Sequence, residues 1–175
     1  IFVDQCALRI KQVCPEAKFV LMIRDPIKRA HSAWNMNRNR DTEMSPFDVC
    51  VDRNLANLDE YRSHGTAEYQ YVQRGFYLDQ IKRWLEVFPD RDQLLVVIAE
   101  HLRGEKGEEE YSKIFNHIGA SAVDSFVVEE EHVGSYGSGE GMASGTISAK
   151  VEAKLKRVYR DHNEALFEFL GFRIE

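Results

Sequence analysis

The chain has 175 residues, of which 43% are apolar and 30% charged, and its formal net charge at pH 7 is −6. This composition is typical of a soluble globular domain, and a chain of this length buries roughly 70% of its unfolded surface. We therefore expect residues 1–175 to form a single domain. The acidic balance argues against a nucleic-acid-binding protein held by bulk charge. No apolar run reaches the roughly 18–20 residues that a membrane-spanning helix requires.

The residues that usually bind metals are poorly arranged for that purpose. Cys6, Cys14 and Cys50 form no CxxC pair, and the six histidines show no H-x-x-x-H spacing. The odd cysteine count gives no sign of a disulfide framework. We expect buried free thiols and no metal site.

Proline, glycine and capping residues divide the chain into helices and short apolar strands. Asp25-Pro26 and Ser45-Pro46 each supply an N-cap residue and a first helical proline. The apolar runs have the length of strands buried on both faces, as in a parallel sheet. In chain order, we predict a helix at 8–13, a strand at 18–23, helices at 25–37, 45–62 and 76–88, a strand at 93–98, and helices at 108–118 and 147–170.

Helices alternate with apolar strands in this order, which predicts an α/β class with a parallel sheet. The helix before Pro89 has a strong apolar stripe, on which Tyr77 and Trp84 are expected to belong to the core rather than to a ligand site. Residues 129–146 hold five glycines and predict a long loop, which in a compact domain is usually functional or disordered.

The segment Lys18–Trp34, KFVLMIRDPIKRAHSAW, carries the clearest chemistry. Ligands of open parallel sheets bind beyond the C-terminal ends of the strands, and Arg24 is the first residue past such an end. If Asp25 caps the next helix, Ser32 lies two turns along the same stripe as Asp25. A guanidinium and a hydroxyl in these positions can reach one phosphate. Arginine suits this role because its guanidinium can donate two parallel hydrogen bonds to a phosphate.

Plainer interpretations of the same residues stay open. Arg24 could pair with Asp25 or another nearby carboxylate, and Ser32 could fill a helix position without a ligand. His31 lies on the neighbouring helix face, where a surface or packing role is favoured over catalysis. Phe126 precedes an acidic run, where core packing is favoured over contact with a ligand.

The order strand, Arg, Asp, Pro and then Arg-Ala-x-Ser-x-aromatic resembles the 3′-phosphate-binding motif of sulfotransferases that use 3′-phosphoadenylyl sulfate (PAPS). The likeness is greatest to carbohydrate sulfotransferases of the heparan-sulfate type and their bacterial relatives. In that family the arginine at the strand end and the serine eight residues later hold the 3′-phosphate of the cofactor. The resemblance therefore implies that Arg24 and Ser32 bind PAPS.

The resemblance continues over nearly the whole chain. Gly75-Phe76-Tyr77 with the following WL and FP pairs, the segment QLLVVIAEHL and the last helix are similar to family elements in order and spacing. This implies a P-loop-kinase-like three-layer fold with a central parallel sheet. Its first strand and phosphate loop are expected to be missing, because the family's Pro-Lys-x-Gly-Thr loop does not occur in the sequence and the chain opens on Ile1.

A second departure from the family lies in the glycine-rich loop. Heparan-sulfate enzymes cover the 3′-phosphate with Lys-Gly-Arg, and the matching residues are Glu140, Gly141 and Met142. The glycine is kept and both cations are lost. We expect Gly141 and Met142 to contact the cofactor through backbone groups only.

The implied activity is sulfuryl transfer from PAPS to a hydroxyl or amine, with a carbohydrate favoured as acceptor. No catalytic residue can be assigned, since the family's general base also lies upstream, and this fragment alone is expected to be inactive. The resemblance implies a Golgi-lumen enzyme on a missing N-terminal anchor in a eukaryote, or a cytoplasmic enzyme in a bacterium. Two alternatives remain: a nucleotide or small-molecule kinase of the same fold, and a non-catalytic binding module.

Overall fold

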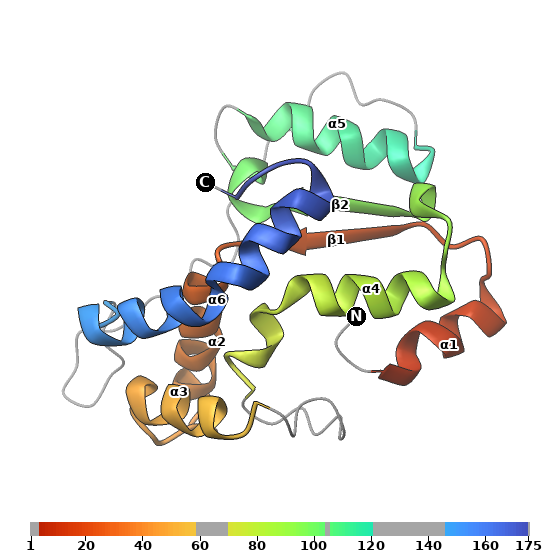
Figure 1. Ribbon diagram of the computed structural model, residues 1–175. Helices are drawn as coiled ribbons and strands as arrows, with labels where there is room; N and C mark the ends of the chain where they lie inside the picture. Colours follow the sequence, from red (N-terminus) through yellow and green to blue (C-terminus); the bar gives the residue numbers. More distant parts are fainter. Residues whose placement is uncertain (1–3, 59–69, 104–105, 121–145, 175) are drawn as a thin grey trace.

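The computed structural model describes residues 4–58, 70–103, 106–120 and 146–174. Two strands and six α-helices lie within these ranges, with short 3-10 helices between them (Figure 1). The strands are β1 (Phe19–Ile23) and β2 (Leu94–Ile98). The helices are α1 (Asp4–Val13), α2 (Pro26–Asn39), α3 (Phe47–Ala56), α4 (Tyr77–Val87), α5 (Gly107–Ile118) and α6 (Ala149–Leu170). The 3-10 helices are η2 (Gln73–Gly75), η3 (Arg91–Gln93) and η4 (Ala99–Leu102).

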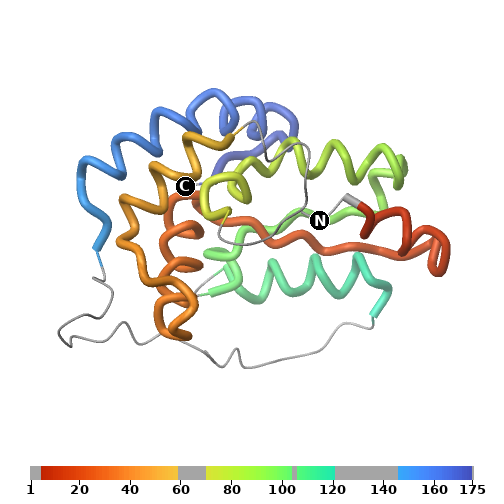
Figure 2. Tube along the Cα trace, turned by 90° about the horizontal axis from the view of Figure 1, so that it is seen from below, coloured from red at the N-terminus to blue at the C-terminus, as the bar shows by residue number. Residues whose placement is uncertain are grey.

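The two strands are parallel neighbours, paired from Phe19 with Leu94 to Ile23 with Ile98. In both views the sheet lies between α4 and α5 (Figures 1 and 2). Ile23 packs with Ile81 of α4 and with the end of α6 in one apolar cluster. The predicted mixture of helices with a parallel sheet is therefore present.

The face of β1 that points away from α4 is uncovered among the described residues. Val20 is 38% exposed and Met22 is 55% exposed, whereas Val97 of β2 is only 1% exposed. The physical reason is that α5 packs on β2, leaving the neighbouring strand open. The prediction that both strands are buried on both faces is thus wrong for β1.

Helix boundaries follow the capping residues closely at some ends and not at others. The Asp25 side chain accepts a hydrogen bond from the Lys28 backbone N–H at 2.7 Å, with Pro26 as the first helical residue. At the other end of the chain, Gly171 stops α6 in the left-handed conformation, with φ of 77°. Helix α3 ends at Ala56, six residues before the predicted end.

The cysteines are free thiols, but only one is buried. Cys50 lies in the core, where burial raises the pKa of its thiol to about 12, and Cys14 is exposed, contrary to the prediction. Cys14 is exposed because it follows the last turn of α1 rather than facing the core. Over the described ranges, no group of three His, Cys, Asp or Glu residues is arranged to hold a metal ion. No helix in those ranges has the length and apolar character needed to cross a membrane.

Replacing Asp25 by Ala is expected to lower the free energy of unfolding by about 0.5–2 kcal/mol, because the Lys28 N–H loses its acceptor. Asp25→Asn keeps a capping oxygen and should stay within a few tenths of a kcal/mol of the wild type. Urea unfolding of the two variants measures the difference. Equal losses in both would mean that the carboxylate charge, rather than the cap, supports α2.

Candidate functional site

The C-terminal ends of the two strands bring two charged residues together. Because β1 and β2 end in register at Ile23 and Ile98, the residues that follow them lie at one edge of the sheet. There the Nε atom of Arg24 is 3.7 Å from Oε1 of Glu100, the second residue of η4. This edge is where open parallel sheets bind their ligands.

The ion pair between Arg24 and Glu100 is loose. The side chains are 37% and 35% exposed, and 3.7 Å is too long for a hydrogen bond. Arg24 Nε and Glu100 Oε2 are both buried without a hydrogen-bond partner in the described part of the chain. Pairs this exposed contribute at most about 1 kcal/mol. A carboxylate partner for Arg24 therefore exists, and it is Glu100 rather than Asp25, but it holds the guanidinium weakly.

Further cationic and hydroxyl groups lie near Arg24, on α2, η2, α4 and α6. The Arg29 guanidinium feels the charges of Arg24 and Arg74 and the hydroxyls of Tyr77 and Tyr159, while burial lowers its pKa below the usual range. Burial raises the pKa of Tyr77 to about 12, opposed by the charge of Arg29 and by a contact with the Arg24 backbone. Arg24, Arg29 and Arg74 thus bring three positive charges close to the two tyrosine hydroxyls.

Ser32 lies on α2 seven residues after its cap and is half-buried. Helical geometry puts Asp25, Arg29 and Ser32 on one stripe, as the sequence predicts. His31 points elsewhere: it is buried, stacks on Trp34 with ring centroids 5.5 Å apart, and meets the Phe47 ring edge-on at 5.0 Å. The packing interpretation of His31 is confirmed.

Comparisons with known proteins identify similar sulfotransferases. No family model matches the chain. It is 26% identical over 176 residues to the mouse bifunctional heparan sulfate N-deacetylase/N-sulfotransferase 3, covering 93% of this chain and 20% of that protein. It is 25% identical over 181 residues to mouse heparan sulfate glucosamine 3-O-sulfotransferase 3B1, covering 93% of this chain and 44% of that one. The chain thus spans less than half the length of these two relatives.

A solved structure, the sulfotransferase from Alicyclobacillus acidocaldarius, superposes with a TM-score of 0.74 at 22% identity. The match covers 99% of this chain and 62% of that one. The chain is similar to sulfotransferases in sequence and in fold. The resemblance noted in the sequence is thereby confirmed, and the fold is that of a sulfotransferase.

Two of the residues expected to bind the cofactor in a sulfotransferase, Gly141 and Met142, lie outside the described residues, as do Glu140 and Phe126. Their roles stay predictions. Tyr77 and Trp84 are buried, in agreement with the core assignment, although the Tyr77 hydroxyl also lies beside the backbone of Arg24.

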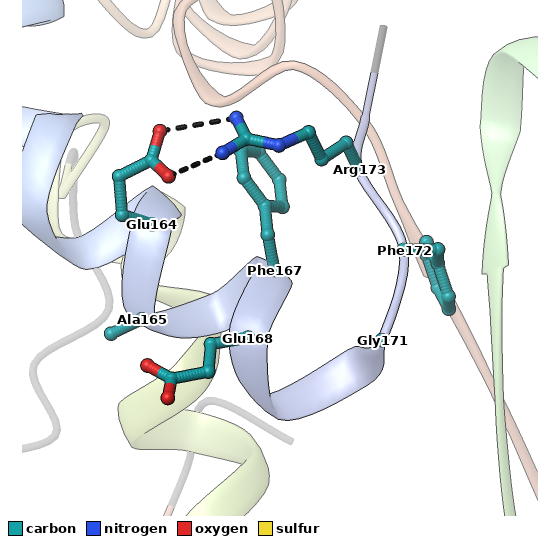
Figure 3. Close-up of a pocket in the computed structure, with 7 residues that line it drawn as sticks. All are labelled: Glu164, Ala165, Phe167, Glu168, Gly171, Phe172 and Arg173. Atoms are coloured by element: carbon teal, nitrogen blue, oxygen red, sulfur yellow. Dashed lines mark hydrogen bonds and ion pairs between the residues drawn. The ribbon is translucent and has the colours of Figure 1, made fainter.

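A pocket of about 490 Å³ lies at the C-terminal end of α6 (Figure 3). None of the predicted sulfotransferase site residues lines it. Arg173 folds back over it and donates two hydrogen bonds to Glu164, at 3.1 and 2.6 Å. The Arg173 charge is therefore already paired. Glu168 adds a further carboxylate to the lining, which makes the pocket unfavourable for a phosphate or sulfate group.

Sequence reasoning missed three contributors to the strand edge: Glu100, Arg29 and Arg74. Arg29 could have been found, because it falls on the stripe between Asp25 and Ser32. Glu100 and Arg74 come from distant segments, and only the parallel pairing of β1 with β2 and the packing of η2 on α2 bring them near Arg24.

Proposed function

We propose that the full-length protein transfers a sulfuryl group from PAPS to a hydroxyl or amine of a carbohydrate. The observation that carries this proposal is the loosely paired Arg24 guanidinium at the sheet edge, with Ser32 on the adjoining helix stripe. Support for the donor and acceptor comes from the heparan sulfate sulfotransferases to which the chain is similar.

The residues of the strand edge fit a nucleotide phosphate in charge and in number of donors. Arg24 pairs loosely with Glu100, and the charges of Arg24 and Arg74 both act on Arg29, so these three guanidinium groups would attract a phosphate dianion. In the proposed complex Arg24 and Ser32 bind the 3′-phosphate of PAPS. The backbone at Gly141 and Met142 is proposed to close over the same group.

When bound, PAPS supplies the sulfuryl group, which is displaced in line by the acceptor. As for phosphoryl transfer, the protein contributes positioning and charge stabilisation. The proposed contribution of residues 1–175 is to bind the nucleotide by its 3′-phosphate, which holds the 5′ end with its sulfuryl group in one position. No metal ion is part of the proposal.

The remaining parts of the site are proposed to lie upstream of residue 1, namely the first strand and phosphate loop of a P-loop-kinase-like three-layer fold. Among the described residues β1 pairs with β2 along one edge only, which supports this, because its other edge is open to a further strand. Residues 1–175 would then be most of a single domain, inactive without the upstream loop and general base.

The test is thermal unfolding of the full-length protein with adenosine 3′,5′-bisphosphate (PAP) or ATP, followed by a transfer assay with labelled PAPS and heparan-type glycans. At 100 times its Kd, PAP should stabilise the protein by about 2.7 kcal/mol. The expected result is a PAP-dependent rise in Tm of several degrees with little effect of ATP. Protection by ATP alone would favour the kinase, and protection by neither would favour a non-catalytic module.

A further inference from the structure

Residues 71–75, which lead into α4 and include η2, are held in place by polar side chains in addition to the backbone bonds of η2. Each anchor comes from a different helix and bonds the backbone of this segment. The anchors are Arg29 of α2 to Tyr71 O, Asn54 of α3 to Val72 N at 3.0 Å, Gln80 of α4 to Arg74 O at 3.1 Å, and Tyr159 of α6 to Val72 O at 2.7 Å.

Arg29 differs from the other three anchors because it carries a charge. One arm of its guanidinium donates to the Tyr71 carbonyl, and it also lies within hydrogen-bonding reach of the Tyr159 hydroxyl. Its Nε atom is buried and has no hydrogen-bond partner in the ranges that the structure describes. The groups that act most strongly on its charge are two tyrosines and two arginines, none of them a carboxylate.

Arg29 is half-buried, so its charge carries a desolvation cost, whereas a neutral amide could also donate to the Tyr71 carbonyl. Gln80 shows that this fold uses an amide donor for another carbonyl of the same segment, that of Arg74. An anion bound at the strand edge would compensate the charge of Arg29. On α2, Arg29 lies on the stripe between Asp25 and Ser32, close enough to Arg24 for the two charges to interact.

We propose that Arg29 is a positioning residue of the anion site. Its guanidinium links α2 to residues 71–75 through the hydrogen bond to the Tyr71 carbonyl. Its charge raises the positive potential at the place where Arg24 and Ser32 bind the ligand. This inference rests on the proposed function, in which the ligand is the 3′-phosphate of PAPS. It assigns a role to an arginine that has no direct contact with the ligand.

The test measures PAP affinity by calorimetry on the full-length protein carrying Arg29→Met or Arg29→Lys. Arg29→Met removes both the hydrogen-bonding guanidinium and its charge, and it is expected to weaken PAP binding about tenfold or more. Arg29→Lys keeps the charge but not the planar guanidinium, so it should recover part of that loss. The control is Phe88→Leu, which disturbs the buried contact of α1 with α4 away from the strand edge and should leave PAP affinity unchanged at a comparable loss of Tm.

Should Arg29→Met fail to fold, Tyr159→Phe tests the same attachment of residues 71–75. It removes the hydroxyl that donates to the Val72 carbonyl and lies beside Arg29. That variant should weaken PAP binding several-fold and speed amide exchange in residues 71–75. Wild-type PAP affinity in the folded Arg29 variants, with only Tm lowered, would overturn the inference and leave the proposed function intact. A wild-type protein that does not bind PAP would overturn the proposed function itself, and this inference with it.

Discussion

Arg24→Ala is expected to weaken PAP binding to the full-length protein about 10- to 100-fold. A charge-assisted hydrogen bond contributes roughly 1.5–3 kcal/mol, and each 1.4 kcal/mol is a factor of ten in affinity. The loose pair with Glu100 offsets little of this, because both side chains are about one-third exposed. Titration calorimetry measures the change directly.

Arg53→Ala is the matched control for Arg24, because it also removes one guanidinium from the surface of the same chain. Arg53 lies on α3, where it is exposed and donates to the Ser45 hydroxyl at 2.9 Å. Its loss should change the Kd for PAP less than twofold. Equal weakening by both variants would show that net charge, rather than the position of Arg24, determines nucleotide binding.

Gly75→Ala is expected to destabilise the fold by about 1–3 kcal/mol, the usual cost of overpacking a core. A Cβ atom at position 75 would lie 2.6 Å from the Tyr159 hydroxyl oxygen and 2.8 Å from two ring carbons. Tyr159 is only 1% exposed and its hydroxyl bonds the Val72 carbonyl, so the ring has nowhere to move. Thermal unfolding of the full-length protein measures the loss.

Tyr159→Phe provides the partner for Gly75→Ala in a double-mutant cycle. Without the hydroxyl the closest contact disappears, but the two ring carbons remain, so the double variant should recover only part of the loss. Strict additivity of the two changes would contradict the close approach of Tyr159 to Gly75.

Local signals in the sequence were sufficient for much of the fold. Asp25-Pro26 defined the start of α2, Pro89 the end of α4 and Gly171 the end of α6, because capping and proline chemistry act within a few residues. The apolar run at Phe19–Ile23 predicted β1, and its pairing with β2 followed from the alternation of helices and strands.

Features that depend on contacts between distant segments were not predictable in this way. Nothing near Arg24 in the sequence indicates Glu100, which arrives through the parallel register of the sheet. The half-buried Arg29 resembles any helical arginine in the sequence, and only the folded structure places Tyr71 and Tyr159 beside it. The end of α3 at Ala56 was missed because neither proline nor glycine marks it.

Recognition of the ribose 3′-phosphate is tested most directly by comparing PAP with adenosine 5′-phosphate, which lacks only that group. In the wild-type protein PAP should bind about 10- to 100-fold more tightly than adenosine 5′-phosphate, and Arg24→Ala should bring this ratio close to one. A ratio that Arg24→Ala leaves unchanged, with both nucleotides weakened alike, would show that Arg24 does not bind the 3′-phosphate.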